Sequence, residues 1–210
     1  MKWQQDLIKD IRRNDGTDGR DLPDRCYSEP GWPHGNAWKT NSDENKRILE
    51  EKFLSIRDRC LSILEIGISR EGPDSFTNIF IRNKLPNATY IGIDINDKTY
   101  LDNRDNHVYT IRASSSDYEY CKNIINTFFG IQQFDFIFID GWHSVNQVLQ
   151  DWEYTNMLTP NGMVGFHDTQ WHPGPKLFME ALDTDKWNVI PNAVVDNEQD
   201  WGIGFVWPKN

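Results

Sequence analysis

From residue 61 onwards, short apolar runs alternate with stretches of helical periodicity, and this alternation limits the possible folds more than any other feature. Each apolar run has about five residues, the usual length of a buried strand. The predicted strands are 62–66, 89–93, 107–111, 134–139 and 162–166. The predicted helices are 73–83, 117–128, 145–158 and 175–183. Strands and helices that alternate in this way form a parallel sheet covered by helices on both faces.

Two further apolar runs, 187–190 and 202–207, are joined by a segment without helical periodicity. We predict that they pair antiparallel at one edge of the sheet. The fold class is therefore α/β, a Rossmann-like doubly wound sheet. In such a sheet ligands bind beyond the carboxyl ends of the strands, so the residues that follow each strand are the candidate site.

The first sixty residues follow a different pattern. Residues 3–11 have the spacing of a short amphipathic helix, and Ser42 is the predicted N-cap of a helix that extends to about residue 59. Between them, segment 14–42 is rich in Gly, Pro, Asp and Asn but also contains aromatic residues. A loop of this length is usually functional or disordered, and the aromatic residues favour a lid or a substrate-facing segment.

Charge and cysteine content narrow the range of partners. The net charge is −10; residues 1–60 hold 12 basic and 12 acidic residues, whereas residues 61–210 hold 10 and 20. Such an acidic surface repels nucleic acid. No apolar run is long enough for a membrane span, and the three cysteines are far apart, as in a reducing compartment. We expect a soluble cytoplasmic protein that binds neither nucleic acid nor membrane, and a homo-oligomer is compatible with the sequence.

The turns after the first two strands suit a nucleotide-like ligand. Glu65 and Gly67 begin the run EIGISREGP, in which Gly67 permits a tight turn and a close approach of the backbone. Ser69 stands where a dinucleotide signature would have its second glycine. Asp94 ends the second strand, where it could accept hydrogen bonds from ribose hydroxyls or, alternatively, cap a helix.

The third strand is followed by the polar run SSSD at residues 114–117. Ser115 and Asp117 in this run suit the lining of an adenine pocket. An N-cap for the helix that follows is the alternative, and the two roles are compatible.

The strongest signal follows the fourth and fifth strands. Asp140 and His143 lie in FDFIFIDGWHS, and His167 and Asp168 lie in GMVGFHD. Because these strands should be neighbours, the two carboxylates should meet at one edge of the sheet, where a divalent cation would relieve their repulsion. The alternative is that the aspartates cap helices and the histidines are ordinary surface residues.

Taken together, LEIGISREG, YIGIDIN and the stretch from Phe134 to Asp168 resemble the class I S-adenosylmethionine-dependent methyltransferases. The chain is most similar to the small metal-dependent O-methyltransferases of the methyltransferase family 24 type, which include enzymes acting on sugars of natural products. The resemblance covers about residues 60–207. It divides the chain into N-terminal helices and a lid segment at 1–60 and a cofactor-binding domain at 61–210.

The resemblance implies a seven-stranded sheet with a reversed last hairpin and assigns roles to individual residues. Glu65 and Gly67 would border the methionine part of the cofactor, Asp94 would bind the ribose, and Ser115 or Asp117 would lie near the adenine. The implied cofactor-binding residues are Glu65, Gly67, Ser69, Asp94, Ser115, Asp117 and Asp140. The implied metal ligands are Asp140, His167 and Asp168.

The same resemblance indicates which metal the site binds and which residue is the general base. Relatives more often have two oxygen-bearing side chains where this chain has His167 and Asp168. Magnesium is the expected ion, and manganese or another transition metal becomes the alternative if His167 is a ligand. His143 stands at the position of the family's general base, three residues after Asp140.

The predicted reaction is metal-assisted O-methylation of a small-molecule hydroxyl, on a sugar or another natural-product-like acceptor. Two other functions remain open at this point. A metal-dependent hydrolase could use the same Asp/His cluster to activate water. A non-catalytic module that binds S-adenosylmethionine would keep the cofactor turns without needing His143.

Overall fold

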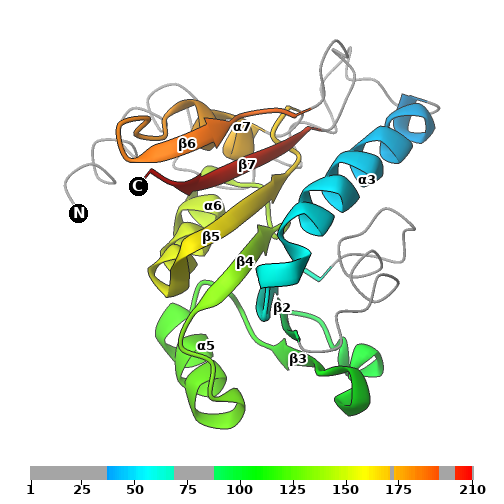
Figure 1. Ribbon diagram of the computed structural model, residues 1–210, viewed down its shortest axis with the longest axis vertical. Helices are drawn as coiled ribbons and strands as arrows, with labels where there is room; N and C mark the ends of the chain where they lie inside the picture. Colours follow the sequence, from blue (N-terminus) through cyan, green and yellow to red (C-terminus); the bar gives the residue numbers. More distant parts are fainter. Residues whose placement is uncertain (1–36, 69–87, 171–172, 194–201, 210) are drawn as a thin grey trace.

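The structure is a computed structural model of the 210-residue chain, and it describes residues 37–68, 88–170, 173–193 and 202–209. Seven strands form one sheet in the order β3-β2-β1-β4-β5-β7-β6 (Figure 1). Their bounds are β1 Ser62–Ile66, β2 Thr89–Asp94, β3 Val108–Arg112, β4 Phe134–Ile139, β5 Leu158–His167, β6 Trp187–Ile190 and β7 Ile203–Pro208. The described α-helices are α3 Ala37–Ile56, α5 Tyr118–Ile124, α6 Val145–Asp151 and α7 Pro173–Glu180.

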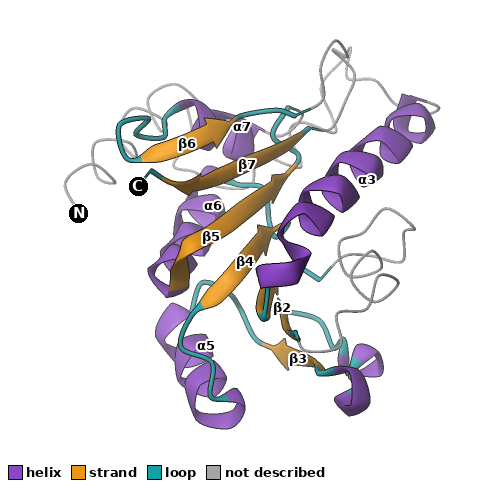
Figure 2. Cartoon of the chain, in the orientation of Figure 1, coloured by secondary structure: helices purple, strands orange, loops and turns teal. Residues whose placement is uncertain are grey.

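The directions of the strands confirm the predicted fold class. Strands β1 to β5 are parallel to their neighbours, whereas β7 runs antiparallel to both β5 and β6. The sheet is therefore mixed, with the reversed last hairpin that the sequence led us to expect. Strands β4 and β5 are hydrogen-bonded neighbours, and their arrowheads point to the same edge of the sheet (Figure 2).

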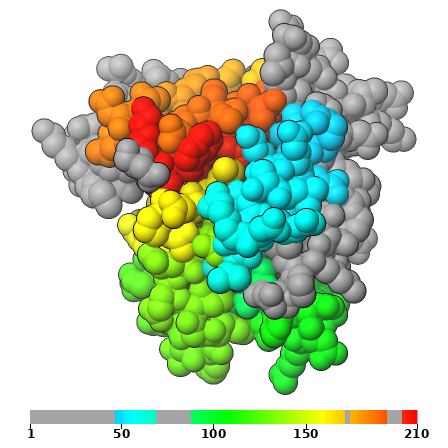
Figure 3. All heavy atoms as spheres, in the orientation of Figure 1, coloured from blue at the N-terminus to red at the C-terminus, as the bar shows by residue number. Residues whose placement is uncertain are grey.

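The two faces of the sheet carry separate apolar layers. Along β4, Phe136 and Phe138 pack with residues of α3, whereas Ile137 and Ile139 pack with residues of α5, α6 and α7. This alternation follows from the two-residue period of a strand. Helix α3 thus covers one face and the other three helices cover the opposite face (Figure 1). On the α3 side, the helix lies against the C-terminal strands (Figure 3).

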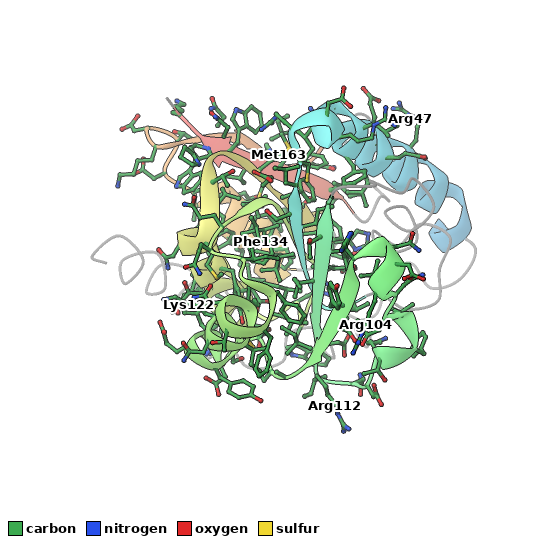
Figure 4. The ribbon with its side chains drawn as sticks, turned by 60° about the horizontal axis from the view of Figure 1, so that its bottom comes forward. Arg47, Arg104, Arg112, Lys122, Phe134 and Met163 are labelled. Carbon is green, nitrogen blue, oxygen red and sulfur yellow. The ribbon has the colours of Figure 1, made fainter. Side chains whose placement is uncertain are left out.

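Many charged side chains lie outside these layers. Figure 4 places Phe134 within the packed interior, where it is fully buried, whereas Arg112 and Lys122 lie at the periphery. None of the described helices is both long enough and apolar enough to cross a membrane.

Some predicted boundaries were wrong. Helix α3 begins at Ala37, so Ser42 lies inside the helix and is not its N-cap, and residues 37–42 do not belong to a loop. Residues 37–41 contain neither Gly nor Pro, so nothing in their sequence stops the helix from beginning earlier. Strand β5 begins at Leu158, four residues before its predicted start, with a shift of register opposite β4 between Phe134 and Phe136.

The other elements largely match their predictions. Helix α5 continues as a π-helical turn to Phe129 and stops at Gly130, and α6 continues as a 3₁₀ helix, Trp152–Met157. The predicted helices at 3–11 and 73–83 lie outside the described residues, as does the lid segment up to residue 36. Their predictions therefore stay predictions.

The turn after β1 brings the ends of two strands together. Gly67 has a positive φ of 78°, and a Cβ atom at this position would overlap the carbonyl oxygen of Asp140. Its N–H donates a hydrogen bond to the carbonyl of Ile93 at 2.9 Å. The sequence predicted that Gly67 allows a tight turn and a close backbone approach, and the structure confirms both. Residue 67 must be glycine for β1 and β4 to end side by side.

Gly67→Ala should therefore destabilise the protein more than Gly130→Ala does. Gly130 also has a positive φ, 68°, but a Cβ atom there would meet nothing within 4 Å. The free energy of unfolding of the control, Gly130→Ala, should fall by about 1–2 kcal/mol because of the left-handed backbone alone. In Gly67→Ala the free energy of unfolding should fall by a further ~1–3 kcal/mol because the backbone must shift. Urea unfolding measures both losses, and equal losses would contradict the steric argument.

Candidate active site

The candidate site lies where the central parallel strands end. The register pairs Ile66 with both Ile93 and Ile139, and Ile139 with Phe166. The residues that directly follow these positions on four neighbouring strands therefore meet at one edge of the sheet. They include the turn at Gly67 and three acidic or imidazole side chains that the sequence singled out.

Two aspartates and two histidines form a compact cluster at this edge. His143 Nε2 lies 3.4 Å from Asp140 Oδ1 and 3.2 Å from Asp168 Oδ2. His167 Nδ1 lies 3.3 Å from the same oxygen of Asp140 and 3.2 Å from the same oxygen of Asp168. Each imidazole thus contacts both carboxylates, and the sequence-predicted metal ligands and base are brought together around one point.

Local backbone structure holds each member of this cluster. The N–H of Asp140 donates to the carbonyl of Ile66 at 2.8 Å, which ties the residue to β1. Asp168 follows β5 in a left-handed conformation with φ 58°, a conformation that non-glycine residues adopt mainly where the surroundings enforce it. His143 directly precedes Ser144, whose Oγ accepts the N–H of Gln147 at 3.2 Å and caps α6.

Burial and charge oppose each other in the cluster. Burial favours the neutral form of Asp140, but the charge of His167 and hydrogen bonds from both histidines hold the pKa of Asp140 below its usual value. Burial likewise lowers the pKa of His167, but Asp168 and Asp140 outweigh it and raise that pKa well above the ordinary histidine value. Charge pairing between the carboxylates and the imidazole of His167 therefore outweighs the effect of burial.

The same side chains have the composition and spacing of a metal site. Asp140, His143 and Asp168 each offer one ligand atom, and these atoms lie within 4.8 Å of one another. His167 Nδ1 faces the same two carboxylate oxygens from its own position at the end of β5. The residues present therefore fit a divalent ion, with carboxylate oxygens and imidazole nitrogens as donors.

Glu65 and Asp94, two of the predicted cofactor-binding residues, lie in different surroundings. Glu65 is fully buried and accepts a hydrogen bond from the hydroxyl of Tyr90. Asp94 Oδ1 accepts the N–H of Asn96 at 2.7 Å, and Lys98 Nζ lies 4.0 Å from Oδ2. No α-helix begins directly after Asp94, so the capping alternative does not apply to it. Ser69 lies outside the described residues.

The polar run after β3 serves two purposes. Asp117 caps α5 by accepting the N–H of Tyr120 at 3.4 Å, as the capping alternative predicted. Ser115 faces α6: its Oγ accepts from Gln147 Nε2 at 3.0 Å, and its carbonyl accepts from the Tyr154 hydroxyl at 3.0 Å. This loop is thereby held against the helix that follows the Asp140–His143 segment.

Gln147 and Asp151 in α6 make this connection, and sequence reasoning assigned neither a role in the site. Gln147 Nε2 also donates to Asp151 Oδ1 at 2.8 Å, and its Oε1 accepts from Ser116 Oγ at 3.0 Å. Asp151 is fully buried. A signal was present, since the helical periodicity through Val148 and Trp152 assigns position 151 to the buried side.

Asp151 should make stability depend on pH. Burial raises its pKa to about 7, although hydrogen bonds from Ser115 and Gln147 and the attraction of His143 act the other way. The unfolded-state pKa is about 3.9. Between these two values the folded chain holds a proton that the unfolded chain has released. The contribution of this group to stability is therefore complete below about pH 4 and is lost as the pH rises to about 7.

We expect the stability advantage of the wild type over Asp151→Asn to shrink by roughly 2–3 kcal/mol between pH 5 and pH 8. Urea unfolding of both proteins across this range measures the difference. Asp105→Asn is the matched control because Asp105 is exposed, and its difference from the wild type should stay constant. A constant difference for Asp151→Asn as well would show that the group does not titrate as described.

Two large apolar side chains are exposed beside the strand ends. Ile95 follows Asp94 and is 71% exposed, and Trp142, two residues after Asp140, is 49% exposed. Ile95 was missed because one isoleucine after a strand is an ordinary sequence feature. Exposed apolar side chains that flank a polar site suit the faces of a planar ligand.

Comparison with known proteins agrees with this geometry. Residues 74–169 match a family described as a methyltransferase domain. Over these residues, just under half of its length, the chain is similar to methyltransferase domains. The seven-stranded sheet with its reversed last hairpin is the architecture that the resemblance to class I methyltransferases implied. A search of curated proteins gave no match.

Solved structures share this fold at low sequence identity. The methyltransferase MycE of the mycinamycin biosynthetic pathway, solved with Mg, S-adenosylhomocysteine and mycinamycin VI, is 17% identical with a TM-score of 0.56. The match covers 97% of this chain but 54% of the MycE chain, so this protein spans about half the length of that relative.

Two other structures match over most of both chains. The calicheamicin methyltransferase CalS11 is 11% identical with a TM-score of 0.57, over 98% of this chain and 91% of the other. A protein from Thermobifida fusca YX is 15% identical with a TM-score of 0.59, over 99% of this chain and 94% of the other. At these identities the likeness establishes the fold.

Proposed function

We propose that this protein transfers the methyl group of S-adenosylmethionine to a hydroxyl oxygen of a small molecule with the help of a divalent metal. The observation that carries the proposal is the Asp140–His143–His167–Asp168 cluster beside the Gly67 turn. A methyltransferase domain with a metal-binding cluster and a histidine at the strand ends has the groups that O-methylation needs.

Several features support binding of S-adenosylmethionine at this edge. Among the described residues, Asp94 Oδ2 has an ion-pair contact with the ammonium of Lys98 at 4.0 Å, and it can still accept from a ribose hydroxyl. Ile95 and Trp142 offer exposed apolar surface for the adenine. The bound cofactor supplies a methyl group on a sulfonium, already activated for in-line displacement. The protein then has to align the acceptor and remove its proton.

Asp140 and Asp168 would hold the metal together with an imidazole. A bound divalent ion lowers the pKa of an acceptor hydroxyl by withdrawing electron density from it. The two carboxylates also position the imidazoles, since each lies within 3.4 Å of both histidine nitrogens. Their arrangement restricts where an acceptor oxygen can approach.

His143 is the proposed general base. Its neutral imidazole would take the acceptor's proton at Nε2 while the oxygen forms its bond to the methyl carbon and the carbon–sulfur bond breaks. The carboxylates of Asp140 and Asp168, 3.4 and 3.2 Å from that nitrogen, would stabilise the imidazolium. Burial of His143 excludes bulk water from this step.

The named relatives support a sugar or natural-product hydroxyl as the acceptor. MycE was solved with mycinamycin VI, and a second CalS11 structure is described as a TDP-rhamnose 3′-O-methyltransferase. TDP-rhamnose and mycinamycin VI are therefore the first acceptors to test. Formation of S-adenosylhomocysteine with either compound tests the proposed reaction directly. Hydrolysis of an ester or phosphodiester without cofactor would instead favour the hydrolase alternative.

Asp94→Ala should weaken cofactor binding without unfolding the protein. Each lost charge-assisted hydrogen bond costs about 1.5–3 kcal/mol, so the affinity for S-adenosylhomocysteine should fall by at least about tenfold. Titration calorimetry measures this affinity. Asp105→Ala, which removes an exposed carboxylate at the opposite end of β3, should bind normally. Unchanged affinity in Asp94→Ala would remove Asp94 from the cofactor site.

Asp140→Ala and His143→Ala should separate metal binding from proton removal. Asp140→Ala should lose the metal and with it activity, because the ion loses a carboxylate ligand. His143→Ala should keep metal and cofactor but lose about 10²–10⁴-fold in rate, and part of the rate should return at higher pH.

Calorimetry with the metal and initial rates across pH measure these effects. His107→Asn, a change to an exposed histidine at the start of β3, is the matched control and should behave as the wild type. If His143→Ala loses the metal and its residual rate is independent of pH, His143 is a ligand and another group must be the base.

A further inference from the structure

The donor atoms around the proposed metal position are of two kinds. Two carboxylate oxygens, from Asp140 and Asp168, are each contacted by two imidazole nitrogens at 3.2–3.4 Å. Among the described residues no third carboxylate joins this group. Half of the potential ligands are therefore nitrogen atoms, and the negative charge available to a cation is that of two carboxylates.

The two imidazoles reach the carboxylates from different faces of the sheet. His143 precedes α6, on the side where Phe166 packs. His167 follows Phe166 on β5 and so points to the opposite face, where its ring lies edge-on to Phe138 at 6.4 Å. A metal and an acceptor between them would thus have one histidine on each side.

The backbone of His167 is part of the sheet, whereas the backbone of His143 is not. It is the last residue of β5 and is paired with Ile203 of β7 in the ladder, and its ring packs against Phe138. His143 lies in the segment between β4 and α6, outside any helix or strand. A donor whose backbone and ring are both fixed suits a ligand, because little freedom is lost when the ion binds.

We infer that His167 is a metal ligand beside Asp140 and Asp168, and that it makes this site select a first-row transition ion such as Mn²⁺, Fe²⁺, Co²⁺ or Zn²⁺ over Mg²⁺. The inference rests on the proposed function in one respect: the ion is taken to lower the pKa of the acceptor hydroxyl. Mg²⁺ prefers an octahedron of oxygen ligands and gives up its waters reluctantly. Imidazole nitrogen suits the transition ions, which bind nitrogen ligands more tightly along the series from Mn²⁺ to Cu²⁺. His143 then remains available as the base.

Metal binding to the full-length protein tests the selectivity. The dissociation constants of Mn²⁺ and Mg²⁺ are measured by calorimetry for the wild type and for His167→Asp, after removal of metal with a chelator. We expect Mn²⁺ to bind far more tightly than Mg²⁺ in the wild type, and the Mg²⁺/Mn²⁺ ratio of dissociation constants to fall by at least about tenfold in His167→Asp. An unchanged ratio would overturn the inference.

Pulsed electron paramagnetic resonance of bound Mn²⁺ identifies the ligand atom. A directly coordinated nitrogen should give ¹⁴N coupling in the wild type and in His143→Ala, and this coupling should disappear in His167→Asp. Coupling that is absent from the wild type, or that persists in His167→Asp, would overturn the assignment. If His167→Asp does not unfold cooperatively, His167→Asn takes its place, since it also exchanges nitrogen for oxygen.

Separate measurements keep this inference apart from the proposed function. Binding of S-adenosylhomocysteine and methyl transfer to the two acceptors are assayed on the same preparations. Methyl transfer by a protein whose Mn²⁺ has only oxygen ligands would sustain the function and overturn the role of His167. If the ion has a nitrogen ligand but the protein neither binds S-adenosylhomocysteine nor transfers methyl, the role of His167 is sustained and the proposed function is overturned.

Discussion

The close approach of the ends of β1 and β4 is the constraint on which the rest of the site depends. Gly67 lies so near the carbonyl of Asp140 that no side chain fits between them. The hydrogen bond from the N–H of Asp140 to the carbonyl of Ile66 closes the same contact from the other strand. Together they place the turn after β1 next to the segment that carries Asp140 and His143.

Around this contact, the protein buries carboxylates and imidazoles that could together bind a divalent ion. Two carboxylates at neighbouring strand ends would repel each other, and here two imidazoles contact both of them. The buried carboxyl of Asp151 lies behind the same segment and is joined to the loop after β3 through Gln147. The loop that would face the adenine and the segment that would hold the metal are thus supported by one helix.

Much of the architecture could be predicted from local pattern alone. The alternation of apolar runs and helical stretches predicted a parallel sheet with a reversed last hairpin, because strand period and element length are local properties. Element boundaries were less predictable. The predicted start of α3 was wrong because several residues before Ser42 also form a helix readily. Strand β5 was predicted too short because Pro160, a residue that rarely occurs within strands, lies among its first residues.

The sequence by itself determined which chemistry the strand ends carry, since an acid or a histidine that directly follows a buried strand must lie at the carboxyl edge of the sheet. Tertiary structure alone decided which of these groups meet. His143 and His167 contact the same oxygens of Asp140 and Asp168 because β4 pairs with β5, and Asp168 has a left-handed backbone at this point. The structure also shows that Asp117 caps a helix and that Ser115 accepts a hydrogen bond from Gln147. These contacts join segments that are distant in sequence, and local periodicity carries no information about side-chain direction across such distances.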